Sequence, residues 1–501
     1  MTGADGNHPV PNGFASHELE EDGAMNPPTR VKAVNLGGWL VTEGWIKPSL
    51  FDGIPNKDLL DGTRLQFKSA ANGKYLSVDN GRGGAVRADA VDASAGETFR
   101  LWRIADGIFQ FRVSNKQFVG LDSDDKATLV ASYELAGKSE TFEVLRCPDD
   151  PMLVRIRAPN GYFLQVRTDE LVAADCEDKA CWVDDDPSVF SITITKKLEG
   201  EFQVTNGYGL EKAEQIMREH WSTYIIEEDF KFVSENGLNT VRIPVGWWIA
   251  SDPTPPPPYV GGSLVALDNA FSWAKKHKLK VIIDLHAASG SQNGWEHSSS
   301  RDGFQEWAAT DDDIRETVAV IEFLTARYSD NPSLYAVQLL NEPLSPIVSL
   351  ENIAKFYKAG FEAVRRHSPT SYVIFSTVLG TGPEDLLPLA SVLERSVIDV
   401  HYYNLFRTTF DTIEGNMDCV YTKRSAHLSS FTKEGGPLTF IGEWVAEWKV
   451  KGATAEELKR FAEAQLEVYG KATFGWAYWT LKNVNNHWSL EWMIKNGYIK
   501  I

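Results

Sequence analysis

The chain has 501 residues, of which 43% are hydrophobic and 11% aromatic, and its formal net charge is −19. The length allows one α/β barrel of roughly 250–400 residues and one smaller domain, each with a well-packed core. The negative charge argues against nucleic acid as a partner, because nucleic-acid binding needs a basic surface, and it favours a neutral partner.

The first 29 residues are polar and include an acidic cluster between positions 18 and 22. They contain no apolar stretch typical of a secretory signal, so we predict a disordered leader over 1–29. The one Asn-x-Ser sequon, Asn331-Pro332-Ser333, is blocked by its proline. No apolar run of ~18 residues occurs in the sequence, and we expect neither a membrane span nor a membrane partner.

Eight short apolar runs outside residues 60–197 predict β-strands. They lie at 31–40, 239–244, 280–286, 335–341, 372–376, 397–402, 438–443 and 474–480. Between them, apolar residues recur every three or four positions, which predicts helices at 225–236, 264–277, 314–328, 353–367 and 455–469. Alternating strands and helices imply parallel pairing, and eight such units predict a (β/α)8 TIM barrel formed by residues 30–60 and 198–501.

Residues 61–197 show short alternating strands, turn pairs such as Asn72-Gly73, and no helical period, so we predict an all-β domain there. Three similar segments, centred on Tyr75, Phe118 and Phe163, recur at intervals of 43 and 45 residues. A second set of aromatic residues follows them at Phe99, Phe142 and Phe190. A threefold repeat indicates three equivalent units with one core, and the pattern resembles the β-trefoil of fascin-like and ricin-B-like domains. The domain is predicted to be inserted after the first barrel strand.

Four cysteines are too few for a disulfide framework. Cys176 and Cys181 allow either a disulfide or two thiols, and Cys147 and Cys419 are expected to be isolated. No CxxC or HExxH spacing occurs, so we expect no metal and no other cofactor.

Two strings, Asn341-Glu342-Pro343 and Gly442-Glu443-Trp444, each place a carboxylate at the carboxyl end of a predicted buried strand. A TIM barrel keeps its active site at this end, although a single such Glu is more often an ordinary solvent-facing charge. A facing pair about 5 to 5.5 Å apart is the machinery of a retaining glycosidase. We predict that Glu342 donates a proton, with its pKa raised by burial or by a neighbouring charge. Glu443 is the predicted nucleophile, which hydrogen bonds keep ionised.

Other polar residues end neighbouring strands on the same side of the predicted barrel. They are Arg242, His286, His401, Tyr403 and Trp479. An Arg in an apolar strand needs a carboxylate partner, and His and Tyr can orient carboxylates or sugar hydroxyls. A lone His is more often structural, but two at one face favour a site, and Trp479 can form the floor under a sugar ring.

With these motifs the chain resembles glycoside hydrolase family 5, and within it the fungal exo-β-1,3-glucanases. Further motifs carry the resemblance: Asn35-Leu36-Gly37-Gly38-Trp39-Leu40 followed by Glu43 and Trp45, His220-Trp221-Ser222-Thr223, Val241-Arg242-Ile243-Pro244, and Gly290-Ser291-Gln292-Asn293-Gly294.

The resemblance implies roles for eleven residues. Glu342 is the acid/base, Glu443 the nucleophile, and Asn341 the partner of the sugar 2-hydroxyl. The remaining −1 subsite residues are Arg242, His286, His401, Tyr403 and Trp479. Glu43 is expected to bind outer hydroxyls of the terminal glucose, and Trp295 and Phe406 to form an aromatic clamp at the cleft mouth.

The implied activity is that of a monomeric O-glycosyl hydrolase, similar to exo-β-1,3-glucanases and β-glucosidases. The expected substrates are β-glucosides and β-glucan oligosaccharides with β-1,3 or β-1,4 linkages, with transglycosylation as an added possibility. The family resemblance implies secretion to a cell wall, which the leader does not support.

Two features depart from the fungal pattern. The β-trefoil insert resembles the arrangement in plant family members that carry a fascin-like domain. His297 stands where the fungal pattern favours Asn. Linkage and exo action therefore stay open, as does an alternative function, a glycan-binding or actin-binding trefoil joined to an inactive barrel. A trefoil that is merely a spacer is a third possibility.

Overall fold

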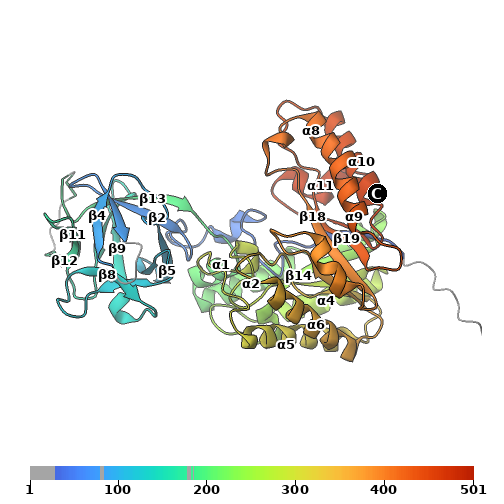
Figure 1. Cartoon of the computed structure of the whole chain (residues 1–501), viewed down its shortest axis with the longest axis horizontal. Helices are drawn as coiled ribbons and strands as arrows, with labels where there is room; N and C mark the ends of the chain where they lie inside the picture. The colour runs from blue at the N-terminus through green and yellow to red at the C-terminus, as the bar shows by residue number, and fades with distance from the viewer. Residues whose placement is uncertain (1–28, 79–83, 178–181, 184) are drawn as a thin grey trace, which may run out of the picture.

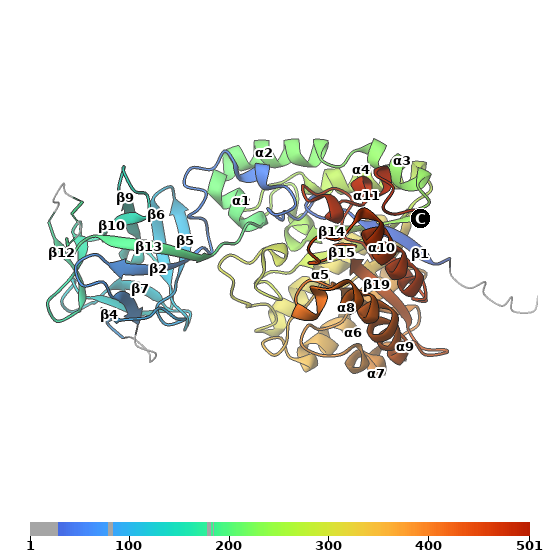
Figure 2. The ribbon, with the colours of Figure 1, turned by 90° about the horizontal axis from the view of Figure 1, so that it is seen from above.

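A computed structural model describes residues 29–78, 84–177, 182–183 and 185–501. The leader over 1–28 and Cys181, half of the possible disulfide, lie outside this part. The described chain forms two domains side by side, a smaller β domain and a larger α/β domain (Figures 1 and 2). Within the described residues, no helix combines the length and the hydrophobicity needed to cross a membrane.

The α/β domain contains a closed barrel of eight parallel strands, which confirms the predicted fold of this part. The strands are β1 (Val31–Asn35), β14 (Thr240–Gly246), β15 (Lys280–Ala287), β16 (Leu334–Gln338), β17 (Tyr372–Ser376), β18 (Ser396–Tyr402), β19 (Leu438–Trp444) and β20 (Gly475–Tyr478). Strand β1 closes the ring because it pairs in parallel with both β14 and β20. Most strand residues are buried, as expected for Val- and Ile-rich strands covered by helices.

Helices surround the barrel, and the five predicted ones are present as α3, α4, α5, α6 and α10 (Figure 2). The helices are α1 (Glu201–Tyr208), α2 (Leu210–Thr223), α3 (Glu227–Glu235), α4 (Ser263–Lys276), α5 (Asp311–Tyr328), α6 (Leu350–His367), α7 (Leu387–Ala390), α8 (Ile413–Asp418), α9 (Ser425–Phe431), α10 (Ala455–Tyr469) and α11 (Leu490–Lys495). Capping boxes begin two of them: Thr310 with Asp313 starts α5, and Thr454 with Glu457 starts α10.

The strand predicted over 31–40 ends at Asn35, because the chain turns at Gly37 and Gly38. Gly38 has a φ of +70°, a conformation that glycine adopts without steric cost. A Cβ on Gly37 would lie 2.8 Å from the Trp479 ring. The two glycines thus let the backbone pass close to Trp479 at the carboxyl end of the barrel.

The β domain consists of antiparallel strands, which confirms the predicted all-β domain. Six of them form a ring in the order β2 (Arg64–Ser69), β5 (Phe99–Ala105), β6 (Ile108–Arg112), β9 (Phe142–Arg146), β10 (Leu153–Arg157) and β13 (Phe190–Lys196). Three hairpins extend from alternate ring strands: β3 (Tyr75–Val78) with β4 (Val86–Ala90), β7 (Phe118–Leu121) with β8 (Leu129–Tyr133), and β11 (Phe163–Val166) with β12 (Val172–Cys176).

The three repeated segments of the sequence occupy equivalent positions in this domain. The repeated aromatic residue begins each hairpin, and a basic residue of the preceding ring strand lies directly opposite it with its charge over the ring. The pairs are Lys68 with Tyr75, Arg112 with Phe118 and Arg157 with Phe163, at 5.3, 5.4 and 4.8 Å from the ring centres. Each unit therefore repeats one cation–π contact.

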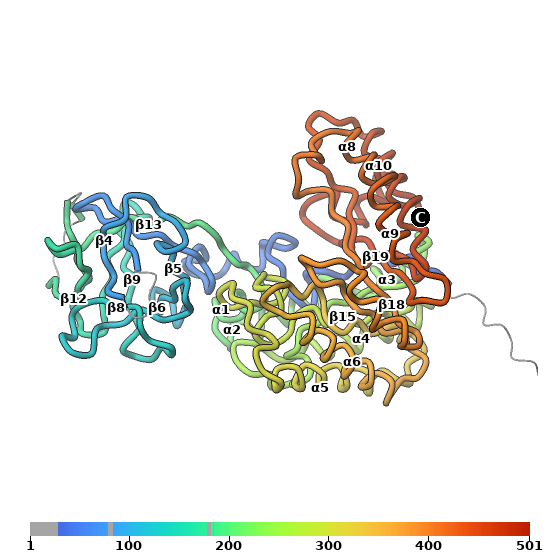
Figure 3. The backbone as a smooth tube through the Cα atoms, viewed as in Figure 1, coloured from blue at the N-terminus to red at the C-terminus, as the bar shows by residue number. Residues whose placement is uncertain are grey.

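Each domain has its own hydrophobic core. In chain order the β domain precedes the long segment that supplies β14 to β20, and of the barrel strands only β1 comes before it. The chain therefore passes twice between the domains, once before β2 and once after β13 (Figure 3).

Candidate active site

The carboxyl ends of the barrel strands open into a cleft of about 940 Å³. Nine of the eleven predicted site residues line it: Glu43, His286, Trp295, Glu342, His401, Tyr403, Phe406, Glu443 and Trp479. The other two, Arg242 and Asn341, are buried outside this lining, where Arg242 donates both to Glu443 and to Asn341. The strand order thus brings together residues that are up to 436 positions apart, from Glu43 to Trp479.

Glu443 lies near the end of β19 and is held by two donors. The Tyr403 hydroxyl donates to Oε2 at 2.7 Å, and Arg242 Nη1 donates to Oε1 at 3.2 Å. Arg242 is completely buried in β14, so its charge requires compensation. It forms an ion pair with Asp284 at 3.1 Å and donates to the amide oxygen of Asn341 at 2.8 Å. A network of fixed polar groups therefore orients Glu443.

Glu342 follows β16 in a left-handed conformation, with a φ of +45°. A residue other than glycine is uncommon there, and such strain concentrates at functional sites. The backbone N–H of Glu342 donates to Ser376 Oγ at 3.2 Å. Its carboxyl lies between two imidazoles, with Oε1 2.6 Å from His401 Nδ1 and Oε2 3.5 Å from His297 Nε2.

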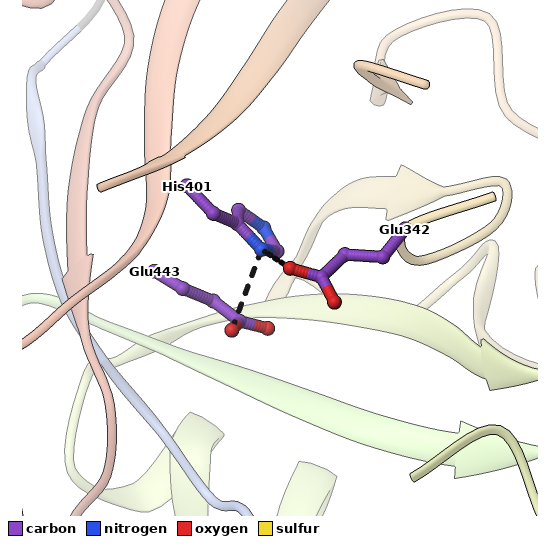
Figure 4. A group of neighbouring side chains, drawn as sticks. All are labelled: Glu342, His401 and Glu443. Atoms are coloured by element: carbon purple, nitrogen blue, oxygen red, sulfur yellow. Dashed lines mark hydrogen bonds and ion pairs between the residues drawn. The ribbon is translucent and has the colours of Figure 1, made fainter. Parts of the chain in front are cut away.

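His401 links the two glutamates (Figure 4). Its Nδ1 is 2.6 Å from Glu342 and 3.4 Å from Glu443, and its Nε2 is 3.1 Å from Asp399. Asp399 also accepts bonds from Gln338 Nε2 and the Gly442 N–H, so it acts as an acceptor and Nε2 carries the proton. His401 Nδ1 and Glu342 therefore share one further proton, which resides on one or the other.

The charges around His401 decide where this proton resides in the free protein. Burial lowers the pKa of His401, but the charges of Glu443, Asp399 and Glu342 outweigh burial and raise it well above its usual value. Burial raises the pKa of Glu342, but the adjacent His401 outweighs that effect and lowers it. The shared proton therefore rests on His401 before substrate binds.

The expected pKa pattern is wrong for the free protein. Burial raises the pKa of Glu443 in spite of the positive charges of His401 and Arg242, whereas the pKa of Glu342 is lowered. The reason is that Glu342 has both the charge and a hydrogen bond of His401 to stabilise its ionised form, whereas burial and the charge of Glu342 raise the pKa of Glu443. The proton that the sequence analysis assigned to Glu342 alone is therefore shared by Glu342 and His401.

Trp479, Glu43, Trp295 and Phe406 line the same cleft as the two carboxylates. The Trp479 ring lies parallel to His286, with ring centres 5.5 Å apart and planes inclined by 10°. Glu43 accepts a bond from Trp45 Nε1 at 2.9 Å, and burial raises its pKa well above the usual value. Trp295 and Phe406 are 37% and 79% exposed at the cleft mouth, so their rings are accessible to a ligand.

Sequence reasoning missed several buried partners of the site, chiefly Asp284 and Asp399. Each occurs two positions before a predicted histidine, and side chains two apart in a strand share a face. Asp284 Oδ2 is accordingly 2.5 Å from His286 Nδ1, and Asp399 binds His401. The repeated Asp-x-His pattern at the ends of two strands was a signal that could have identified both.

A metal ion is an alternative occupant of the centre, because Glu342, His401 and Glu443 each offer a ligand atom within 4.8 Å of the others. A proton on His401 satisfies the same two carboxylates. The geometry is therefore explained by the residues themselves.

Comparisons with known proteins match the two domains separately. A family described as "Domain of unknown function (DUF7910)" matches residues 56–195, and "Cellulase (glycosyl hydrolase family 5)" matches residues 204–485. Probable glucan 1,3-beta-glucosidase A of Emericella nidulans is 31% identical over 358 residues, which cover 62% of this chain and 85% of the relative. Glucan 1,3-beta-glucosidase of Schwanniomyces occidentalis is 30% identical, over 59% of this chain and 78% of the relative.

Among solved structures, the rutinosidase from Aspergillus niger has a TM-score of 0.53 and 20% sequence identity, over 60% of this chain and 88% of that one. This similarity shows the fold alone.

The proton arrangement predicts that the His401 imidazole stays protonated at neutral pH. Glu443→Gln removes the negative charge that contributes most to the raised pKa of His401, so this pKa is expected to fall. NMR of histidine-labelled protein across pH 5 to 9 measures this shift. An unchanged titration in Glu443→Gln contradicts the arrangement, and His427, which binds the Tyr402 hydroxyl outside the carboxylate group, serves as the internal control.

Proposed function

Because this chain belongs to glycoside hydrolase family 5, we propose that it cleaves β-linked glucosides and gluco-oligosaccharides with retention of anomeric configuration. The observation that carries the proposal is that one oxygen of Glu342 and one of Glu443 lie within 4.8 Å of each other. Retaining glycosidases hold their carboxyl groups about 5–5.5 Å apart, whereas inverting enzymes leave about 6.5–9.5 Å for a water. The short spacing supports double displacement.

In the first step an oxygen of ionised Glu443 attacks the anomeric carbon, and the bond to the leaving oxygen breaks. Tyr403 and Arg242 donate to Glu443, so the nucleophile is oriented before the attack. The leaving oxygen takes the proton that Glu342 shares with His401. The glucosyl group remains on Glu443 as an ester.

In the second step Glu342, now ionised, takes a proton from a water whose oxygen attacks the anomeric carbon. The ester bond to Glu443 breaks, and glucose leaves with its original configuration. When a sugar hydroxyl replaces the water, the same step is transglycosylation. The exposed rings of Trp295 and Phe406 support this branch, because they offer a stacking surface to an acceptor sugar.

The proposed −1 subsite is supported by an unused donor and an aromatic floor. Asn341 Nδ2 is buried and has no hydrogen-bond partner within the described part of the chain. Such a donor costs ~1–3 kcal/mol when unsatisfied, which favours a bond to the sugar 2-hydroxyl. Trp479 and His286 form the proposed floor, and Glu43, which also lines the cleft, is the proposed partner of the outer hydroxyls.

For the substrate we favour β-1,3-glucan oligosaccharides, with β-1,4-linked ones second. The support is that the matched relatives are named glucan 1,3-beta-glucosidases. The alternative of a binding protein with an inactive barrel has less support, because all eleven predicted site residues lie in or directly beneath one cleft.

We assign the β domain, over residues 61–197, to the β-trefoil class, and the barrel to residues 30–60 and 198–501. The six-stranded ring, the three hairpins and the repeated cation–π pairs support a threefold domain.

Removing either glutamate tests the proposed mechanism. Glu443→Gln and Glu342→Gln are each expected to lower kcat on an oligosaccharide about 10²- to 10⁴-fold while leaving the thermal unfolding midpoint within a few degrees. Glu201→Gln is a matched control, because Glu201 is equally buried but binds Thr42 outside the cleft lining. Hydrolysis at the wild-type rate by Glu443→Gln would exclude Glu443 as the nucleophile.

The shared proton predicts how the rate depends on pH. As pH rises, loss of this proton removes the acid, so it defines the basic limb of kcat/KM. In His401→Gln the proton must rest on Glu342, a stronger acid than imidazolium, and the basic limb should move to lower pH. Burial lowers the pKa of His297 to about 4, so that ring is neutral at pH 6 to 8, and His297→Asn should leave the limb in place. A basic limb that does not move in His401→Gln contradicts the shared proton.

Product analysis on glucose oligomers with β-1,3, β-1,4 or β-1,6 linkages, and on a β-mannan, tests the substrate assignment. We expect the highest kcat/KM on the β-1,3 oligomers and β-glucose as the first product by proton NMR. Release of α-glucose would contradict retention, and preference for mannan would contradict the glucosyl assignment.

A further inference from the structure

The loop that joins β15 to α5, residues 288–310, forms one wall of the cleft beside Glu342. Asn293 Nδ2 donates to the Glu342 carbonyl oxygen at 3.0 Å and lies 2.8 Å from His297 Nε2. His297 in turn approaches the Glu342 carboxyl at 3.5 Å, and Trp295 stands at the cleft mouth. The position of this loop therefore determines the surroundings of the proposed acid and of one clamp ring.

The far side of the same loop is held by the β domain. The buried Asp302 carboxylate accepts a bond from Arg112 Nη1 at 2.8 Å and one from Trp102 Nε1 at 2.7 Å. Arg100 donates to the Asp302 carbonyl oxygen at 2.7 Å, and its guanidinium lies 3.7 Å from the centre of the Phe304 ring. Arg100 and Trp102 come from β5, and Arg112 comes from β6.

The loop and the β domain are closely packed where they meet. Gly303 has a φ of +81°, and a Cβ there would lie 3.1 Å from the guanidinium groups of Arg64 and Arg100. Next to Asp302, the Arg301 guanidinium lies 3.6 Å from the Trp102 ring centre and donates to Asp61 at 2.9 Å. Residues 301–304 therefore pack closely against the β domain.

Hydrogen bonds within the loop join the turn at residues 301–304 to its active-site part. The Ser300 N–H donates to the Trp295 carbonyl oxygen at 3.2 Å, and Ser300 Oγ donates to the Phe304 carbonyl oxygen at 3.0 Å. The Gly303 N–H donates to Ser300 Oγ at 3.0 Å. Displacement of the turn would therefore be transmitted to Trp295 and His297.

The repeated units of the β domain differ in how they use the basic residue that faces the hairpin aromatic. Arg112 and Arg157 occupy equivalent positions opposite Phe118 and Phe163. Arg157 forms its ion pair with Glu143 inside the β domain at 2.8 Å, whereas Arg112 is directed to Asp302 of the loop and to Glu306 at 2.9 Å.

We propose that the β domain is a positioning element of the active site: Arg112, Trp102 and Arg100 hold Asp302, and thereby fix Trp295 and His297 beside Glu342 on the leaving-group side of the cleft. The proposal rests on the proposed glycosidase function. It assigns the β domain a part in recognising the sugar that leaves, because Glu443, Arg242, Tyr403 and Trp479 belong to other strands or loops.

The experiment compares Arg112→Ala with Arg157→Ala in the full chain, on two substrates. One is a β-1,3-linked glucose trimer, which needs both the leaving-group sugar site and the proton. The other is a dinitrophenyl β-glucoside, whose leaving group needs neither. Arg112→Ala should lower kcat/KM for the trimer at least tenfold, mainly through KM, and change that for the aryl glucoside less than twofold. Arg157→Ala should change both less than twofold, and Arg112→Lys should recover part of the loss because its charge still faces Asp302.

Hydrogen exchange gives a readout that does not depend on activity. Amides of residues 293–306 should exchange faster in Arg112→Ala, and not in Arg157→Ala. Equal losses on both substrates, or unchanged exchange in this segment, would overturn the proposal. If Arg112→Ala fails to fold, Asp302→Asn replaces it with the same expectations. If the wild type hydrolyses neither substrate, the proposed function fails, and the exchange comparison still decides whether the β domain holds the loop.

Discussion

The structure of the site depends on one buried cation. The Arg242 guanidinium is fully enclosed beneath the cleft, where an uncompensated charge would cost several kcal/mol. It therefore binds groups from several strands and strand ends: Asn35, Asp284, Gln338, Asn341 and Glu443. This requirement fixes the orientation of Glu443 before any substrate arrives. Charge compensation in the barrel interior therefore orients the proposed nucleophile.

A second charge balance governs the proposed acid. His401 stands between Glu342 and Glu443 with Asp399 behind it, so three carboxylates compete for its protons. Asp399 fixes which ring nitrogen is protonated, and the remaining proton is left for Glu342 to use. The residue that stores the proton and the residue that delivers it are then different, and the distance between them, 2.6 Å, allows direct transfer.

In the proposed scheme, the β domain positions the residues on the leaving-group side of the cleft. The barrel supplies the carboxylates and the sugar floor, while the wall beside Glu342 is a long loop whose outer turn is enclosed by arginines and a tryptophan of the other domain. A loop that is also held at its outer turn is more rigid than one held only where it joins its strand and its helix. In the proposed scheme the barrel sets the chemistry, and the second domain adjusts which sugar can leave.

The sequence alone determined the barrel, the all-β domain and the pair of glutamates, because strand and helix periods and strand-end motifs are local patterns. Its threefold aromatic repeat predicted three equivalent β units, and the repeated aromatic residues begin the three hairpins of the β domain. It did not reveal the proton on His401 or the partners Asp284 and Asp399, because pKa values depend on charges that meet only when the barrel closes. Nor did it reveal the Arg112–Asp302 contact, which joins residues 190 positions apart in two domains. Tertiary structure decided these features, since hydrogen bonds and ion pairs act over a few ångströms in space, whatever the separation along the chain.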